Sequence, residues 1–383
     1  MTRIAVIGGG ITGLATAHAL AARGASVTLF EARRLGAMAS TWTLGGVRQS
    51  GRDPAELPLA RAAIERWSRL DEALGAPTGY RREGNMRLAR TEAEIEVIRA
   101  MVAAQRERGL SLEFLENSAD IRAIAPAIGD AVLAASFCPG DGHADPDMTI
   151  AAYADGLRRM GVTIMEGAPV HRLTTAKGRV TGLETPAGAF VADAVVLAAG
   201  IHAPALLAPL GIGLPMVAKR VCVLRTVATA PAFEQVFGVA NADCAGRQEI
   251  GGAFRITTGI GDWPGDPTRW SEDALRPPLD TVADLIQRTA PLLPVLAGLG
   301  LERCWGGLID LTPDALPVLD SPPEWPGLVI GAGFSGHGFG IGPVSGEILA
   351  SLALREATPF ALEPFRLARF AQLSGQAPLT LHG

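Results

Sequence analysis

The sequence predicts an α/β fold with two discontinuous domains, and three observations support this prediction. Residues 3–32 read as a buried strand, a glycine turn, an apolar-faced helix and a second buried strand, which is a βαβ unit. Residues 327–354 repeat the order of strand, glycine turn and helix near the other end of the chain. Between them, residues 216–260 alternate in polarity and contain glycine turns, a pattern typical of an antiparallel sheet. We therefore expect a Rossmann-like domain made of three separated segments and interrupted twice by pieces of a sheet-rich domain.

The N-terminal βαβ unit matches a dinucleotide-binding motif in both spacing and context. Gly8, Gly10 and Gly13 have the G-x-G-x-x-G spacing that allows a tight turn, backbone approach to a pyrophosphate and close packing of helix on strand. The helix N-terminus offers free N–H groups to phosphates, and Glu31 at the end of the second strand suits the ribose hydroxyls. The glycines alone could form a structural turn, so the flanking strands, helix and acid are what favour an adenine dinucleotide. The residues expected to bind it are Gly8, Gly10, Ile11, Thr12, Gly13, Glu31, Ala32 and Arg33.

Composition excludes several classes of protein. A chain of 383 residues with 48% hydrophobic content can bury large cores and favours two domains, or one large domain with an insertion. The net charge of −5 gives no basic field for nucleic acid. The apolar runs are too short to cross a membrane, and Met1 leads almost directly into the first strand without room for a signal sequence. We therefore expect a cytoplasmic protein.

The cysteines predict no metal site. Cys138, Cys222, Cys244 and Cys304 are isolated in the sequence and form no C-x-x-C pair, so neither zinc nor an iron–sulfur cluster is expected. In a reducing compartment we expect four free thiols rather than disulfides.

The middle of the chain reads as alternating loops, helices and strands. Residues 35–51 form a loop that is rich in small and hydroxyl side chains, and long loops of this kind are usually functional. Helical spacing follows over 55–74, a strand over 80–88, and a helix to residue 108 with Thr91 as N-cap and Glu94 three residues on. A strand from residue 132 leads into a glycine turn, and Pro146 opens a helix through residue 160, with Asp145 as its cap. A helix is also expected over 273–289.

Five stretches in this order resemble the D-amino acid oxidase (DAO) family of flavoproteins. They are the N-terminal βαβ unit, FCPGDGHADPDMT (137–149), VVLAAG (195–200), WGGLIDLTPDALPVLD (305–320) and GFSGHGFGIGP (333–343). Within that family the similarity leans toward sarcosine oxidase beta subunits, glycine oxidase and D-hydroxyproline dehydrogenase. The resemblance implies an FAD-binding domain at 1–80, 145–215 and 319–383, with an antiparallel-sheet substrate domain at 81–144 and 216–318.

The resemblance also implies how FAD is held. The backbone at Val170 is expected beside the adenine, and the Ala199–Gly200 turn near the cofactor. The N–H groups at the start of the last helix are expected to face the flavin pyrimidine oxygens, where a helix N-terminus favours reduction. Trp305 is expected to be a packed wall beside the flavin rather than a platform for the substrate. Further residues expected at the cofactor are Ser40, Thr41, Thr43, Gly45, Gly46, Gly333, Phe334, Gly336, His337, Gly338, Phe339 and Gly340.

Two departures from relatives in the family limit what the resemblance implies. Monomeric sarcosine oxidases attach the flavin through a Cys just before the TPD stretch, but Gly307 stands at that position here, and Cys304 is three residues away. We therefore expect non-covalent FAD. The same enzymes have a Lys after G-H-G-F that holds the substrate carboxylate, and this chain has Gly340 there. The carboxylate anchor is therefore expected elsewhere.

Four residues are candidates for the reaction itself. Arg48 matches an arginine that relatives place near flavin and substrate, and this interpretation is favoured over that of an exposed loop arginine. Arg247 and Arg255 belong to the antiparallel segment, where strand alternation sends half of such side chains outward. His337 is expected near the flavin, more as a structural residue than as a proton carrier. Lys219 is a weaker alternative for the anchor, because a surface role at a domain boundary suits it better.

The predicted activity is oxidation of the C–N bond of a small amino or imino acid, with hydride transfer to flavin N5 and hydrolysis of the imine product. D-amino acids, N-alkyl amino acids, proline-type acids and opines all remain open as substrates, as does the electron acceptor. One alternative is an FAD-carrying subunit that passes electrons to partner subunits, and a homo-oligomer is also open. Another alternative, a nicotinamide-dependent dehydrogenase, has no use for the C-terminal glycine segment.

Overall fold

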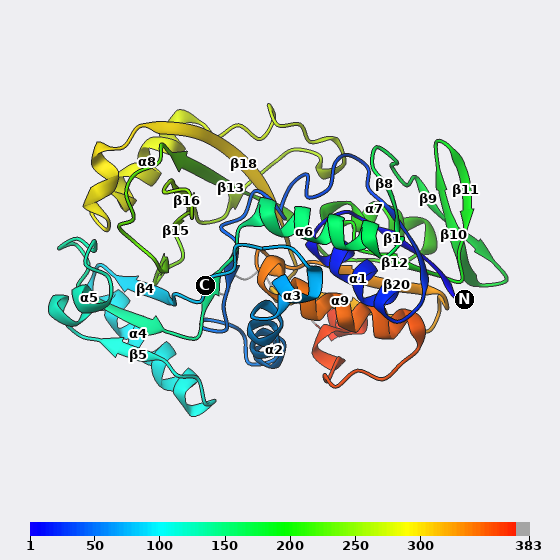
Figure 1. The fold of residues 1–383 in the computed structure, drawn as a ribbon, viewed down its shortest axis with the longest axis horizontal. Helices are drawn as coiled ribbons and strands as arrows, with labels where there is room; N and C mark the ends of the chain where they lie inside the picture. The colour runs from blue at the N-terminus through cyan, green and yellow to red at the C-terminus, as the bar shows by residue number, and fades with distance from the viewer. Residues whose placement is uncertain (373–383) are drawn as a thin grey trace.

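The computed structural model describes residues 1–372, and it divides into two lobes, each built on one large sheet (Figure 1). The lobe that contains the N-terminus has a six-stranded sheet in the order β19-β20-β12-β1-β2-β8. Five of its strands are parallel and β19 is an antiparallel edge. The strands are β1 (Arg3–Ile7), β2 (Ser26–Phe30), β8 (Thr163–Met165), β12 (Ala194–Leu197), β19 (Val318–Asp320) and β20 (Leu328–Ala332).

The six-stranded sheet is covered on both faces, as its nearly continuous apolar strands require. Helices α1 (Ile11–Ala22) and α9 (Gly338–Leu354) pack directly on one face. Outside them, α6 (Pro146–Arg159) packs on α1, α2 (Leu57–Trp67) packs on α9, and α3 (Leu70–Leu74) packs on α6. The other face packs against a small sheet of β9 (Arg172–Ala176), β10 (Arg179–Thr185) and β11 (Gly188–Val191), and against α7 (Ala203–Leu207). Strand alternation explains the two cores, because Ile4 and Val6 face the helices while Ala5 and Ile7 face the small sheet.

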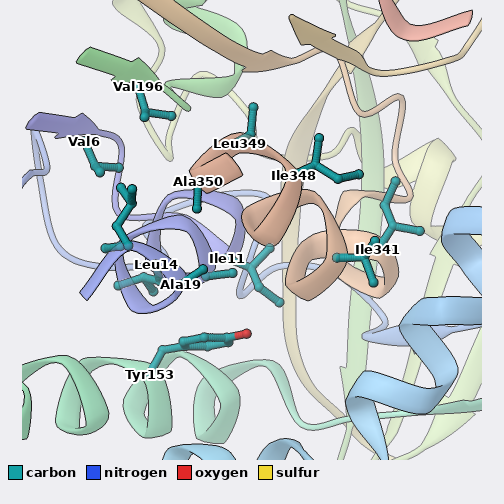
Figure 2. Packing of buried hydrophobic residues seen from close by; sticks show 14 of the residues in the cluster. Val6, Ile11, Leu14, Ala19, Tyr153, Val196, Ile341, Ile348, Leu349 and Ala350 are labelled. Atoms are coloured by element: carbon teal, nitrogen blue, oxygen red, sulfur yellow. The ribbon is translucent and has the colours of Figure 1, made fainter. Parts of the chain in front are cut away.

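Helices α1 and α9 cross in close contact, although they come from opposite ends of the chain (Figure 2). Figure 2 shows Ile11 and Leu14 of α1 beside Ile341, Ile348 and Ala350 of α9. The contact depends on small residues, because a Cβ at Gly346 would lie 2.6 Å from the backbone carbon of Ala15. The two glycine-rich turns that precede α1 and α9 are therefore held next to each other.

The second lobe is a nine-stranded, largely antiparallel sheet with the order β17-β13-β16-β15-β14-β4-β6-β5, and β18 pairs with β13. The pair β4–β14 is parallel. Helices α4 (Glu92–Glu107), α5 (Ser118–Ile124) and α8 (Leu279–Thr289) pack on this lobe. The strands are β4 (Asn85–Ala89), β5 (Glu113–Leu115), β6 (Ala134–Cys138), β13 (Val217–Thr226), β14 (Val236–Val239), β15 (Cys244–Gln248), β16 (Phe254–Thr258), β17 (Gly261–Asp262) and β18 (Leu301–Leu311).

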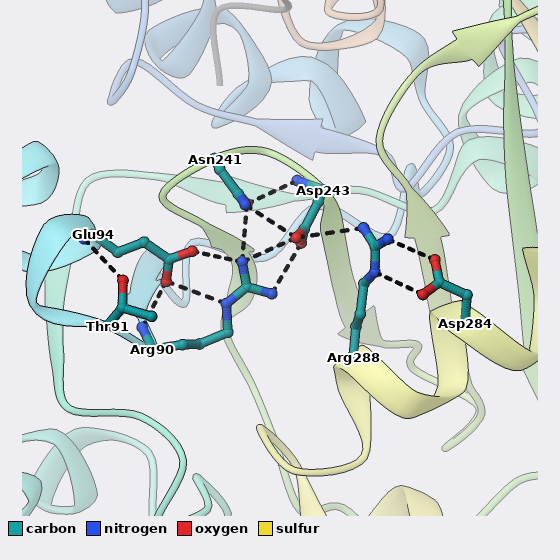
Figure 3. Close-up of polar contacts among 7 residues, drawn as sticks. All are labelled: Arg90, Thr91, Glu94, Asn241, Asp243, Asp284 and Arg288. Atoms are coloured by element: carbon teal, nitrogen blue, oxygen red, sulfur yellow. Dashed lines mark hydrogen bonds and ion pairs between the residues drawn. The ribbon is translucent and has the colours of Figure 1, made fainter.

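An ion-pair network ties the two chain segments of this lobe together (Figure 3). Arg90, at the end of β4, binds Glu94 at 2.6 Å and Asp243 at 3.0 Å. Asp243 also lies 3.4 Å from Arg288 of α8, which pairs with Asp284 at 2.7 Å. Burial raises the pKa of Asp243, but its hydrogen bonds and charge contact with Arg90 outweigh this and lower the pKa overall. The network fixes the strand end that leads into α4.

The predicted α/β fold class is confirmed, and most predicted elements form with small shifts. Thr91 caps α4 by accepting the Glu94 N–H at 3.2 Å, and Asp145 caps α6 by accepting the Met148 N–H at 2.9 Å. The helix expected over 55–74 is instead two helices, and the one expected from 273 begins at Leu279, after Pro277 and Pro278. The strand expected over 80–88 is confined to Asn85–Ala89, since Gly84 adopts a positive φ of 90°.

The domain boundaries stay predictions, and residues 373–383 of the last expected segment lie outside the described residues. All four cysteines are free thiols, although Cys222 and Cys304 approach within 3.6 Å of each other across β13 and β18. Within residues 1–372, no helix is both long and apolar enough to span a membrane.

Candidate functional site

A cavity of about 690 Å³ lies between the two lobes. Its floor is the set of turns that follow β1, β2 and β12, its roof is the inner face of the nine-stranded sheet, and the loop at residues 36–48 forms a wall. Such a crevice at the carboxyl ends of parallel strands is the usual ligand site of an open α/β sheet. The predicted residues that line it are Gly8, Gly10, Ile11, Thr12, Glu31, Ala32, Arg33, Ser40, Thr43, Gly46, Arg48, Val170, Ala199, Gly200, Phe334, Gly336, His337, Gly338 and Phe339.

The remaining predicted residues lie behind this lining. Gly13 packs on the turn, since a Cβ there would meet the Gly8 carbonyl oxygen at 1.9 Å. Gly340 packs on the short strand β3 (Gly46–Val47), where a Cβ would lie 2.8 Å from the Gly46 oxygen. Gly333 donates its N–H to Asp310 at 3.0 Å. The others that do not line the cavity are Thr41, Gly45, Trp305, Arg247 and Arg255.

The first glycine turn has the geometry that a pyrophosphate needs. Gly8 has a φ of 113°, and a Cβ there would strike the Ala198 oxygen at 2.2 Å, so only glycine fits. A Cβ at Gly10 would have one close neighbour, the Ser40 hydroxyl at 3.0 Å, and would otherwise project into open cavity. Ser40 also accepts the N–H of Ile11 at 2.9 Å. The start of α1 is therefore open to a ligand and braced by the loop.

Glu31 is oriented before any ligand arrives. Its carboxylate accepts the N–H groups of Gly9 at 2.7 Å and of Arg33 at 2.8 Å. Burial raises the pKa of Glu31, and these two hydrogen bonds oppose the shift. A carboxylate held in this way at the end of β2 can still accept from the two hydroxyls of a ribose.

Arg247 and Arg255 hold the wall of the cavity from behind rather than entering it. Arg255 donates to the carbonyls of Thr41 at 3.0 Å and Thr43 at 2.8 Å, and pairs with Glu249 at 2.6 Å. Arg247 donates to the carbonyl of Leu44. The burial of Arg247 and the neighbouring charge of Arg255 lower the pKa of Arg247 to about 10, so it stays charged at neutral pH. These two arginines fasten the residue 41–44 loop to the nine-stranded sheet.

Three other arginines gather at one end of the cavity. Arg48 and Arg52 come from the loop and its extension, and Arg87 comes from β4. Arg52 and Arg87 are both about 95% buried. Burial lowers the pKa of all three, and the repulsion of Arg52 lowers the pKa of Arg87 further, to about 10. This group, Arg48, Arg52 and Arg87, is called the arginine cluster below.

Two buried acids partly balance the arginine cluster. Asp141 accepts the N–H groups of Gln49 at 2.8 Å and Ser50 at 3.2 Å, and also the Ser50 hydroxyl. Burial raises the pKa of Asp141, while these hydrogen bonds and Arg48 lower it. Glu56 lies 3.9 Å from Arg52 and 3.0 Å from His337. The three arginines outnumber these two acids, so the cluster has a net positive charge.

His337 is engaged by the protein at both ring nitrogens. Its Nε2 donates to the Ala315 carbonyl at 3.1 Å, and its Nδ1 faces Glu56 at 3.0 Å. Burial lowers the pKa of His337; Glu56 opposes this shift, and the charge of Arg52 offsets part of that opposition. These two contacts position the turn that opens α9.

The roof of the cavity is a row of small side chains on adjacent strands. Gly238, Ala245 and Thr257 face each other in register across β14, β15 and β16, and Arg87 stands beside Gly238 on β4. All four line the cavity. On β18, Gly307 also lines the cavity, whereas Cys304 has its thiol 3.6 Å from Cys222, in the core on the outer side of the sheet.

The segment at residues 267–270 covers the cavity beside β2. Trp270 follows a turn of 3-10 helix (Pro267–Arg269) and packs edge-to-face on Trp42 at 5.7 Å between ring centroids. The guanidinium of Arg33 stacks 3.9 Å over the Trp270 ring, and Trp270 Nε1 donates to His202 at 3.4 Å. These contacts shield the end of the cavity that contains Glu31.

The site fits an extended dinucleotide with a flavin at one end. The open glycine turn before α1 suits the pyrophosphate, the held carboxylate of Glu31 suits the adenosine ribose, and the turn before α9 offers N–H groups at the far end of the same cavity. The fold and this site together define a dinucleotide-dependent oxidoreductase of the two-lobed flavoprotein type.

Comparison with known proteins identifies the family. Residues 3–352 match the DAO family model, described as FAD dependent oxidoreductase, and the chain belongs to this family. FAD is therefore the cofactor that the site fits. Glycine oxidase from Geobacillus kaustophilus is 28% identical over 375 residues, which is 96% of each chain. Sarcosine oxidase subunit beta from an Arthrobacter species is 26% identical, over 96% of this chain and 90% of its own length.

Solved structures agree with the sequence comparison. The crystal structure of the Geobacillus kaustophilus glycine oxidase superposes with a TM-score of 0.88, over 96% of this chain and 99% of the other. The structure of L-proline dehydrogenase from P. horikoshii gives the same TM-score at 27% identity, over 97% and 98%. Both cover the two lobes, so the overall fold is shared across them.

Sequence reasoning missed several residues that line the cavity. Arg52 follows Arg48 by four residues in the same loop, and that spacing is a signal that could have been used. Asn85 and Arg87 are polar residues at alternate positions of an otherwise apolar strand, which is also a readable signal. Trp42, Trp270 and Asp310 carry no local signal, since their positions depend on how the lobes meet.

Proposed function

We propose that this protein oxidises the C–N bond of a small amino or imino acid, with FAD held non-covalently in the cavity. The observation that most supports this is the arginine cluster, whose net positive charge lies in the same enclosed cavity as the dinucleotide-binding turns. A substrate carboxylate would gain charge-assisted hydrogen bonds from these guanidinium groups. Non-covalent binding is supported by Gly307 at the position of the attachment residue and by Cys304 on the other side of the sheet.

The residues of this chain have three roles in that reaction. The arginine cluster binds the carboxylate and so orients the neighbouring C–H bond. Arg247 and Arg255 keep the loop at residues 41–44 rigid against the sheet, which holds the shape of the cavity. Trp42 and Trp270 exclude water from one end. FAD, when bound, accepts the hydride, and water then hydrolyses the released imine to a carbonyl compound and an amine.

The test is anaerobic bleaching of the oxidised flavin absorbance by a panel of D-amino acids, N-methyl amino acids, prolines and opines. The proposal expects at least one to bleach the flavin at a rate that saturates with its concentration, and expects its decarboxylated analogue to act far more slowly. If no member of the panel bleaches the flavin, or if the decarboxylated amines act equally well, the proposed function is wrong.

A second candidate is an FAD-carrying subunit of a hetero-oligomer, and the similarity to sarcosine oxidase subunit beta over 96% of this chain favours it. Under this proposal the reduced flavin passes its electrons to a partner subunit rather than directly to an external acceptor. Steady-state turnover of the purified chain with oxygen or an artificial acceptor separates the two. Substrate bleaching without steady-state turnover supports the subunit, and full turnover supports the stand-alone enzyme.

A further inference from the structure

Arg87 has a charge that no group in the described residues satisfies. It lies at the middle of β4 with its side chain on the inner face of the sheet, is 6% exposed and lines the cavity. Within residues 1–372 its guanidinium donates no hydrogen bond, whereas Arg52 donates to the Arg48 carbonyl and Arg255 to two loop carbonyls. Asp141 is the acid that acts on Arg87, and that carboxylate is already occupied by Gln49 and Ser50. A buried cation with free donors that face a cavity is a binding group for an anion.

The charge balance indicates what kind of anion. The three arginines of the cluster outnumber Asp141 and Glu56, so the cluster has a net positive charge. A dicarboxylic amino acid carries one more negative charge than a monocarboxylic amino acid, and it therefore balances more of that charge. Cancelling a buried charge is worth more than cancelling an exposed one, because screening by water is weak there.

The roof gives an elongated substrate room beside Arg87. Its neighbours in register are Gly238 and then Ala245, the two smallest side chains available. A Cβ on Gly238 would have Ala245 Cβ at 3.9 Å as its closest contact, so the space below is open. Adjacent strands lie about 4.8 Å apart, so the small-residue trough extends roughly 10 Å from β4 to β15. A second acidic arm can reach Arg87 without displacing a side chain.

We propose that the preferred substrate is a dicarboxylic amino or imino acid, and that Arg87 binds its second carboxylate. This inference rests on the proposed function, because it assigns the substrate class of the same site. All such substrates have a second carboxylate near the first. This second carboxylate lies either on the side chain or on the substituent of the nitrogen. Arg87 is then a specificity-determining residue, and Arg48 with Arg52 takes the carboxylate next to the oxidised bond.

The experiment compares two matched substrate pairs by anaerobic flavin bleaching. Sarcosine and iminodiacetate differ by a carboxylate on the N-substituent, and D-alanine and D-aspartate differ by a carboxylate on the side chain. We expect the diacid of at least one pair to give a rate constant over dissociation constant at least roughly tenfold higher than its monoacid partner, the value of one charge-assisted pair. The pair that shows the preference locates the second carboxylate.

The variants test whether Arg87 is responsible. In Arg87→Met the diacid preference should disappear, and in Arg87→Lys, which retains the charge, part of it should remain. Arg276→Met, at an arginine whose side chain is 78% exposed and does not line the cavity, is the matched control and should retain the wild-type preference. The FAD content and the unfolding midpoint of each variant show whether it folds. The same preference can be measured without turnover by comparing the affinities of succinate and butyrate, each followed by its perturbation of the flavin spectrum.

Different results would contradict the proposed function and the preference for a second carboxylate. Bleaching by sarcosine or D-alanine with no diacid preference in wild type leaves the proposed function intact and overturns the inference. A diacid preference that survives in Arg87→Met also overturns it. If neither these four compounds nor any other member of the amino acid panel bleaches the flavin, and succinate binds no better than butyrate, both the function and the inference are wrong.

Discussion

The crossing of α1 and α9 makes Gly346 the position where one added methyl group should do the most damage. A Cβ there would lie 2.6 Å from the Ala15 carbonyl carbon and Cβ and 2.7 Å from the Thr16 nitrogen. To bring the 2.6 Å contacts to an ordinary 3.4 Å, the helices must separate by about 0.8 Å. Overpacking lowers the free energy of unfolding by about 1–3 kcal/mol. The upper value applies here, because the contacted backbone atoms of α1 cannot rotate away as a side chain could. The higher helix propensity of alanine returns about 1 kcal/mol, leaving a net loss of about 2 kcal/mol.

The matched control is Gly156→Ala in α6, where the nearest atom would be Leu74 Cδ2 at an ordinary 3.6 Å. That change should stabilise the protein by about 0.5–1 kcal/mol through helix propensity alone. Urea unfolding of both variants, followed by fluorescence, shows whether each substitution raises or lowers the free energy of unfolding. Because α1 and α9 each begin at a turn that lines the cavity, Gly346→Ala should also weaken FAD binding, while Gly156→Ala should not. Equal stability and FAD affinity in the two variants would refute this account of the packing.

Three further predictions use other parts of the structure. Thr91→Ala removes the N-cap of α4 and should lower the unfolding free energy by about 1 kcal/mol in urea titrations, whereas an unchanged midpoint would contradict the cap. Burial raises the pKa of Asp310 from 3.8 to about 6, so its contribution to stability is present at low pH and lost as pH rises through 6. Asp310→Asn should therefore gain about 1.4 kcal/mol relative to wild type between pH 5 and pH 8, and a pH-independent difference would count against the shift. Acid precipitation should release the flavin into the supernatant, since Gly307 cannot attach it and Cys304 has its thiol beside Cys222; flavin that stays in the pellet would show a covalent link.

Short sequence motifs were enough to predict the elements whose structure depends only on neighbouring residues. The βαβ unit at residues 3–32, the caps Thr91 and Asp145, and the tight turn at Gly8 each follow from a few neighbouring residues, and the structure confirms them. The family match confirms FAD and the class of enzyme, which the order of motifs along the chain had indicated.

The substrate end of the cavity could not be predicted in the same way. Whether Arg255 or Arg87 faces a ligand depends on strand register and on what the other lobe presents opposite each of them. Arg255 meets the carbonyls of Thr41 and Thr43, and Arg87 meets open cavity. The pairing of β4 with β14 joins residues about 150 positions apart, and no local pattern encodes it. For the same reason the sequence separates Cys222 from Cys304, which the sheet brings together.

The most direct test of the central claim is stopped-flow reduction of the flavin in wild type and in Arg48→Met, with the best amino acid from the panel and without oxygen. The account predicts that both proteins contain FAD and that wild type reduces it with saturation kinetics. Loss of one charge-assisted pair should raise the substrate dissociation constant of Arg48→Met by roughly 10- to 150-fold. Arg276→Met should match wild type. Wild-type flavin that no amino or imino acid reduces, or an Arg48→Met variant with unchanged substrate affinity, would contradict the account.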